Sequence, residues 1–166
     1  YLNAANKNST LFFAGDYISC DYEDTKRNID LIAQQLNLVK DFKGKTRFVP
    51  GDNEWRSFDS KQIEWVENYI KERNIKRIKV VPNNVCPLEF DEINEDLNIL
   101  YVDSQWYIAN WDRVDDINRK CTDISTRRMF TTELESFIKD SRGKNLVIVM
   151  HHPIFTNGMF GMSYMG

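Results

Sequence analysis

The chain has 166 residues, 42% of them hydrophobic and 13% aromatic, with a net charge of -3 at pH 7 and a pI of about 5.5. This composition supports a folded core and argues against intrinsic disorder. The weakly acidic balance, without a basic stripe, makes a nucleic-acid partner unexpected, and no apolar run reaches the roughly 18 residues of a membrane span.

Apolar runs and apolar residues at helical spacing predict alternating strands and helices along the chain. In chain order these are a strand at 10–15, a helix at 24–41, strands at 46–50 and 76–81 on either side of a helix at 59–73, a strand at 98–108, a helix at 126–141 and a strand at 146–150. Residues 83–96 and 111–125 are polar and predict loops. The alternation indicates an α/β fold in which helices pack on the faces of a mixed β-sheet.

The predicted helices have caps and inward-facing residues that the sequence identifies. Asp59 or Ser60 is expected to cap the second helix, and Ser125 or Thr126 the third. The residues expected to face the core are Ile29, Ile32, Leu36 and Val39 in the first helix, Ile63, Val66 and Ile70 in the second, and Phe130, Leu134, Phe137 and Ile138 in the third.

Polar side chains with ligand chemistry stand at the carboxyl ends of the predicted strands, where ligands gather in α/β sheets. They are Asp16 after 10–15, Asp52, Asn53 and Glu54 after 46–50, Asp103 within 98–108, and His151 and His152 after 146–150. The two histidines are the only ones in the chain. Each residue alone is an ordinary turn or loop residue. Together they match the mixed oxygen and nitrogen site that zinc, manganese or iron occupies.

The chain has three cysteines, Cys20, Cys86 and Cys121, and no CxxC motif, which excludes a zinc ribbon or a thioredoxin motif. Two interpretations remain open. All three are buried thiols, or Cys86 and Cys121 form a disulfide that leaves Cys20 as a free, buried thiol near the Gly15-Asp16 turn. The disulfide would indicate an oxidising compartment.

Several motifs resemble those of the calcineurin-like metallophosphoesterases, the superfamily that includes the purple acid phosphatases. The motifs are AGDYIS (14–19), PGDNEW (50–55) and VMHHPIF (149–155), in the family's order. The stretches VPNNVCPLEF (81–90) and YVDSQWYI (101–108) are similar to a bacterial, often exported branch. The resemblance implies a β-sandwich core. It also implies one incomplete domain over 1–166, since the family's D-x-H motif would precede residue 1 and its G-H-x-H motif would follow residue 166.

The resemblance assigns roles to the residues that match its motifs. Asp16 would bridge two divalent ions (Mn, Zn or Fe), and Asp52 and His151 would bind the second of them. His152 would line the rim of the pocket. Asn53 stands where the family has a histidine that assists the leaving group, and an amide cannot act as an acid near neutral pH.

Three functions follow from these observations. The first is a metal-dependent phosphoester hydrolase with a partly degenerate site. The second is an inactive relative that binds protein partners or has a structural role in a larger assembly, which Asn53 favours. The third is an unrelated α/β domain whose motifs coincide by chance. An exported or periplasmic location is expected from the resemblance and from a Cys86–Cys121 disulfide.

Overall fold

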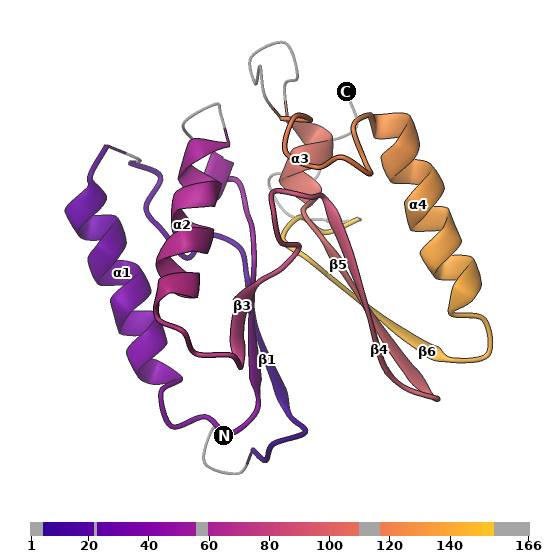
Figure 1. Cartoon of the computed structure of the whole chain (residues 1–166), viewed down its shortest axis with the longest axis horizontal. Coiled ribbons are helices and arrows are strands. Elements are labelled where there is room, and N and C mark those ends of the chain that lie inside the picture. The colour runs from indigo at the N-terminus through magenta and orange to yellow at the C-terminus, as the bar shows by residue number, and fades with distance from the viewer. Residues whose placement is uncertain (1–4, 22, 56–59, 110–116, 155–166) are drawn as a thin grey trace.

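The computed structural model describes residues 5–21, 23–55, 60–109 and 117–154 and places them in an α/β fold (Figure 1). The elements are β1 (Thr10–Ala14), α1 (Thr25–Leu38), β2 (Lys45–Val49), the 3-10 turn η2 (Asn53–Trp55), α2 (Lys61–Glu72), β3 (Ile78–Val80), β4 (Leu88–Asn94), β5 (Leu97–Val102), α3 (Ser104–Ile108), α4 (Arg127–Asp140) and β6 (Asn145–Met150). The predicted α/β class is confirmed. The prediction of one mixed sheet is wrong, because the described strands form two sheets of three strands each.

The first sheet is parallel in the order β1-β2-β3, and the second is mixed in the order β4-β5-β6. In Figure 1, α1 and α2 lie along the outer side of the first sheet and α4 along the outer side of the second. One large apolar cluster lies between the first sheet and the helices α1 and α2. A second lies between the second sheet and α4 and also includes Trp55 of η2 and Ile63 of α2. A third cluster joins the two sheets and contains Val49, Val81, Ile99, Tyr101 and Val149. The helices therefore cover the outer faces, and the inner faces share a core.

The helix predictions are confirmed at most positions. Asp24 caps α1 and Thr126 caps α4, each through a side-chain oxygen that accepts a backbone N–H. Ser60 is the residue before α2 but makes no such bond, and Asp59 lies outside the described residues. Ile138, expected to face inward, is 45% exposed, because α4 turns Phe130, Leu134 and Phe137 toward its sheet.

Residues 88–94 form strand β4, where a loop was predicted. The segment LEFDEIN places Leu88 and Phe90 in the core under α4, and Ile93 on the opposite, inter-sheet side after an irregularity between Glu92 and Asn94. Its acidic residues made the segment resemble a loop in sequence. Antiparallel pairing with β5 decides its conformation, because a strand that is half exposed tolerates charges on one face.

The predicted strand over 98–108 ends at Val102, and the prediction is wrong beyond that residue. Asp103 caps the short helix α3 by accepting the backbone N–H of Trp106 at 3.0 Å. The indole of Trp106 is fully buried and donates to the carbonyl oxygen of Ile117 at 2.7 Å. Trp106, one of the aromatic residues that suggested a strand, is therefore a core residue of a capped helical turn, whereas Tyr107 beside it is exposed.

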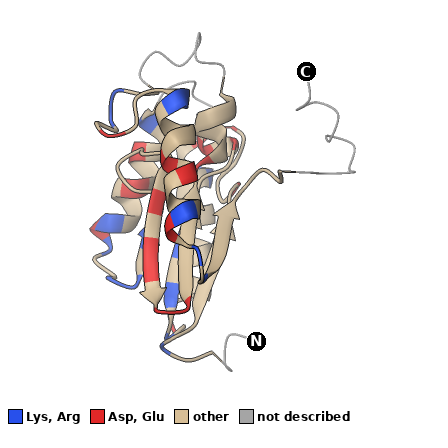
Figure 2. Cartoon of the chain, turned by 90° about the vertical axis from the view of Figure 1, so that its right-hand side faces the viewer, with Lys and Arg blue, Asp and Glu red and all other residues tan. Residues whose placement is uncertain are grey.

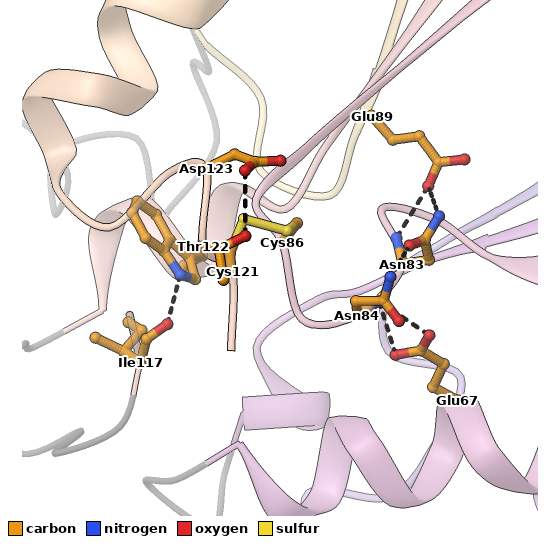
Figure 3. Close-up of a disulfide and its surroundings, with 10 residues drawn as sticks. Glu67, Asn83, Asn84, Cys86, Glu89, Ile117, Cys121, Thr122 and Asp123 are labelled. Atoms are coloured by element: carbon orange, nitrogen blue, oxygen red, sulfur yellow. Dashed lines mark hydrogen bonds between the residues drawn. A yellow bond between two sulfur atoms is a disulfide. The ribbon is translucent and has the colours of Figure 1, made fainter. Parts of the chain in front are cut away.

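Cys86 and Cys121 form a disulfide, with their Cα atoms 4.8 Å apart, which confirms one of the two cysteine interpretations (Figure 3). It ties the segment before β4 to the connection that leads into α4. The neighbouring loop is also anchored: the backbone N–H of Asn83 donates to Glu89, and that of Asn84 to Glu67 on α2, each at 2.9 Å. Cys20 is free, as expected, but exposed rather than buried, because the chain emerges after Ser19.

Charges of both signs are interspersed over the described residues, as the side of the molecule in Figure 2 shows. None of the described helices is long and apolar enough to cross a membrane. The pairings Lys120–Glu64, Lys139–Glu135 and Lys144–Glu92 have nitrogen–oxygen distances of 3.3 to 3.6 Å and lie largely at the surface. Such pairs contribute little to stability, so the apolar clusters determine the fold.

Candidate metal centre

In each sheet, two neighbouring parallel strands end side by side, and a polar residue follows each strand end. The register of the first sheet sets Ala14 beside Val49, so Asp16 and Asp52 both lie just beyond the same edge. In the second sheet Val102 lies beside Met150, so Asp103 and His151 follow neighbouring strand ends. Parallel pairing places equivalent chain ends together, which is why residues far apart in sequence meet here.

His151 connects the two sheets. Its Nδ1 lies 2.8 Å from the carbonyl oxygen of Ala14, so Nδ1 carries the proton and donates it to that acceptor. Its Nε2 lies 3.4 Å from Oδ1 of Asp52 and 3.7 Å from Oδ2 of Asp16. A backbone acceptor on one ring nitrogen, with the other aimed at carboxylates, is the arrangement that metal-binding histidines adopt. The predicted convergence of Asp16, Asp52 and His151 is confirmed.

Two glycines permit this close approach. A Cβ atom on Gly15, whose φ is +89°, would lie 2.1 Å from Nδ1 of His151. A Cβ atom on Gly51 would lie 2.7 Å from Oδ1 of Asp16. Both turns therefore need glycine, because any side chain would push the carboxylate or the imidazole away.

Glu54 joins the turn after β1, which carries Asp16, to the turn after β2, which carries Asp52. Its carboxylate is completely buried and accepts the backbone N–H groups of Asp16 at 3.1 Å, Ile18 at 3.2 Å and Gly51 at 2.7 Å. Burial raises the pKa of Glu54 to about 7, although the N–H groups of Gly51 and Asp16 oppose the shift. Glu54 thus fixes the backbone on which Asp16 and Asp52 stand. The sequence placed Glu54 among the candidate ligands at the strand ends, but it is a buried acceptor of backbone N–H groups instead.

Asn53 does not point into the group formed by the carboxylates and imidazoles. Its backbone N–H donates to Oδ1 of Asp16 at 3.2 Å, and its side-chain amide donates to the carbonyl oxygen of Ile18 at 3.1 Å. Both contacts orient the Asp16 turn. Asn53, for which the resemblance implied the position of a leaving-group acid, therefore stabilises the Asp16 turn in this structure.

His152 lies beside His151, with ring centroids 4.8 Å apart and the rings nearly perpendicular. Nδ1 of His152 is 2.9 Å from Oγ of Ser104, and its backbone N–H donates to the same oxygen at 3.1 Å. Burial lowers the pKa of His152, and His151 adds to the effect. Sequence analysis missed Ser104, because a serine after a capping aspartate carries no signal of its own.

Asp103 is buried behind the site and is not a candidate ligand. Its oxygens accept the indole N–H of Trp55 at 2.9 Å and the backbone N–H of Trp106. Burial raises the pKa of Asp103 to about 7, against the opposing effect of the N–H donors of Trp106 and Trp55. Asp103 therefore links Trp55 in η2, which follows the first sheet's strand β2, to α3, which follows the second sheet's strand β5.

The residues present fit a divalent cation. Within the described part of the chain, Asp52, His151 and His152 form one group whose ligand atoms all lie within 4.8 Å of one another, and Asp16 borders it. One or two carboxylates with two imidazoles suit zinc, manganese or iron. Within the described ranges this is the one group of three or more His, Cys, Asp or Glu donors that lie close together.

Comparisons with protein-family models, with curated proteins and with solved structures found no match to this chain.

Proposed function

We propose that the chain is a metal-dependent phosphoester hydrolase of the calcineurin-like type, with a partly degenerate site. The observation that carries the proposal is the position of His151, whose Nε2 lies 3.4 Å from Asp52 and 3.7 Å from Asp16. Two donors that each lie about 2.1 Å from a tetrahedral ion are about 3.4 Å apart, so Nε2 of His151 and Oδ1 of Asp52 already have the separation of two ligands of one cation, and Oδ2 of Asp16 lies slightly farther from the ring.

A bound divalent cation would polarise a phosphoryl oxygen and make water nucleophilic at neutral pH. The chain's own residues hold the geometry. Asp16 and Asp52 supply negative charge, the Nδ1–H bond of His151 fixes the ring, and Glu54 keeps both acidic turns rigid. Side chains that are fixed before substrate binds need no reorganisation during the reaction.

Asn53 supplies no general acid to protonate the leaving group. Asn53 cannot donate a proton as an acid, and its amide is engaged with the carbonyl oxygen of Ile18. We therefore propose that the substrates are phosphoesters with good leaving groups, such as aryl phosphates, which depart without an acid.

The second candidate is an inactive relative that binds a protein partner or has a structural role in a larger assembly. The engagement of Asn53 with Ile18 favours it, because this contact stabilises a turn and contributes nothing to catalysis. The two candidates differ in one property that can be measured, which is turnover in the presence of metal.

Two further proposals concern fold and location. The apolar cluster between the two sheets, with helices outside, supports a β-sandwich core of the metallophosphoesterase type. The Cys86–Cys121 disulfide supports an exported or periplasmic location, because disulfides persist in oxidising compartments.

The test is hydrolysis of p-nitrophenyl phosphate and bis-p-nitrophenyl phosphate with added Mn²⁺ or Zn²⁺. We expect metal-dependent turnover that Asp16→Asn and His151→Ala abolish, while the exposed Asp30→Asn leaves it unchanged. Asn53→His should raise the rate on an alkyl phosphate such as glycerol phosphate, by up to the 10²–10⁴-fold typical of a general acid, and should change the rate on p-nitrophenyl phosphate little, because p-nitrophenolate leaves without a proton. Absence of turnover in both the wild type and Asn53→His would favour the inactive relative.

A further inference from the structure

The two adjacent histidines lie on the same side of the chain, which a continuing strand would not allow. In an extended strand, neighbouring side chains point to opposite faces. Strand β6 ends at Met150, and the chain bends at His151 and His152. The bend brings both imidazoles to the group that contains Asp52, with all three ligand atoms within 4.8 Å of one another.

Each imidazole is held through the same ring nitrogen. Nδ1 of His151 is bonded to the carbonyl oxygen of Ala14 at 2.8 Å, and Nδ1 of His152 to Oγ of Ser104 at 2.9 Å. Metal-binding histidines usually donate one ring N–H to such an oxygen, which fixes the tautomer and leaves Nε2 as the ligand. Two different elements, β1 and α3, therefore supply equivalent supports to the two rings.

We infer that His152 is a metal ligand, so that Asp52, His151 and His152 bind one divalent cation, with Asp16 completing a four-donor site. The inference rests on the proposed function for the presence of a metal, but it changes the role of His152 from a residue at the pocket rim to a ligand. Two imidazoles and two carboxylates fill the coordination of a tetrahedral Zn²⁺, and they leave positions open for substrate on a larger, six-coordinate Mn²⁺ or Fe²⁺.

Ser104 is the positioning residue in this arrangement. Its oxygen accepts the backbone N–H of His152 at 3.1 Å and lies within hydrogen-bond distance of Nδ1. When Ser104 also accepts from Nδ1–H, Nε2 of His152 carries no proton, and its lone pair can bind a cation. When the hydroxyl donates to Nδ1 instead, Nε2 carries the proton and cannot bind metal, so metal binding selects one tautomer.

The experiment measures metal binding without any substrate. Zn²⁺, Mn²⁺ and Co²⁺ are titrated calorimetrically into metal-free wild-type protein and into Asp52→Asn, His151→Ala, His152→Ala, Ser104→Ala and Asp30→Asn. Loss of an outer partner of a ligand typically lowers affinity 10–100-fold, so we expect about a tenfold loss for Ser104→Ala and at least about a 100-fold loss for His152→Ala. The exposed Asp30→Asn should bind as the wild type does.

Long-range ¹H–¹⁵N spectra of the imidazoles give a second measurement on wild-type protein, which needs no variant to fold. On addition of Zn²⁺, the Nε2 resonances of both histidines should shift together, and both Nδ1 atoms should remain protonated. Circular dichroism and thermal unfolding without metal show whether each variant is folded before its affinity is interpreted.

The outcomes separate the two proposals. If the wild type binds metal, His152→Ala is folded and binds as tightly, and only the His151 resonances shift, then His152 is not a ligand and the proposed function stands. If the wild type binds none of the three ions at millimolar concentration, both proposals fail. A large affinity loss in His152→Ala, together with a shift of its Nε2 resonance, establishes His152 as a ligand.

Discussion

Gly15 and His151 are in direct contact across the two sheets, and a Cβ atom added at Gly15 would lie 2.1 Å from Nδ1 of the imidazole. The same nitrogen is bonded to the carbonyl oxygen of Ala14. The end of β1 thus contacts and orients the imidazole of His151, which follows β6. The sheets are joined at this point by a contact that only glycine allows.

Replacement of Gly15 by alanine should therefore damage both stability and metal binding. Its φ of +89° costs an L-residue about 1–2 kcal/mol, and the new methyl group must also displace His151. We expect a loss of more than about 2 kcal/mol in urea unfolding and weaker Zn²⁺ binding. Gly143→Ala is the matched control, because its φ is +84° and nothing lies within 4 Å of the added atom. Equal losses in both variants would show that contact with His151 is unimportant.

At pH 8, where the carboxylate is ionised, Glu54→Gln should destabilise the protein by about 1–3 kcal/mol, because the amide group cannot accept from all three backbone donors. Two of these donors, Asp16 and Gly51, bond to one carboxylate oxygen, and Ile18 bonds to the other. In either orientation of the glutamine amide, its NH₂ group would face at least one backbone N–H, and two donors cannot form a hydrogen bond. The midpoint of urea denaturation measures the loss. The exposed Glu72→Gln on α2 should change it by less than about 0.5 kcal/mol.

Asp103 should make the wild type less stable as the pH rises through neutrality. Burial raises the pKa of Asp103 to about 7 in the folded state, against 3.8 as its ordinary value. Between about pH 4 and pH 7 the folded protein therefore holds a proton that the unfolded chain has already released. This contribution to stability is fully present below pH 4 and is lost as the pH rises through 7.

The variant Asp103→Asn isolates that contribution, because an amide keeps a cap acceptor for Trp106 and does not titrate. The difference in free energy of unfolding between wild type and variant should fall by a few kcal/mol from pH 4 to pH 8, since one pKa unit corresponds to about 1.4 kcal/mol. Glu54 titrates equally in both proteins and cancels. A difference that is constant with pH would contradict the raised pKa of Asp103.

Removal of the disulfide should cost about 3–4 kcal/mol, because the closed loop spans 35 residues and its closure lowers the entropy of the unfolded chain. Cys86→Ser combined with Cys121→Ser, measured by thermal and urea unfolding, should show this loss. Cys20→Ser should change stability by less than about 0.5 kcal/mol, since Cys20 is exposed and unbridged. Reduction of the wild type with dithiothreitol should reproduce the loss of the double variant.

The sequence alone determined where most elements lie and which residues stand at their ends. Apolar runs fix buried strands, and helical spacing fixes the buried faces of helices, because both depend on local geometry. Ile63, Val66 and Ile70 are buried as predicted. A polar residue that directly follows an apolar strand lies at the end of that strand. The sequence alone therefore placed Asp16, Asp52 and His151 at strand ends.

Only the tertiary structure decided how these ends combine. Strand pairing between distant segments divided the strands into two sheets and placed β4 in one of them. The packing of the connections before β4 and before α4 brought Cys86 and Cys121 together as a disulfide. The bend after Met150 placed the two imidazole rings of His151 and His152 on the same side of the chain. The side-chain amide of Asn53 donates to the carbonyl oxygen of Ile18 and so does not face the candidate metal site. The physical reason is that a local pattern specifies which way a side chain faces within its own element. Which other element it meets depends on register, turns and packing between segments that are far apart in the chain.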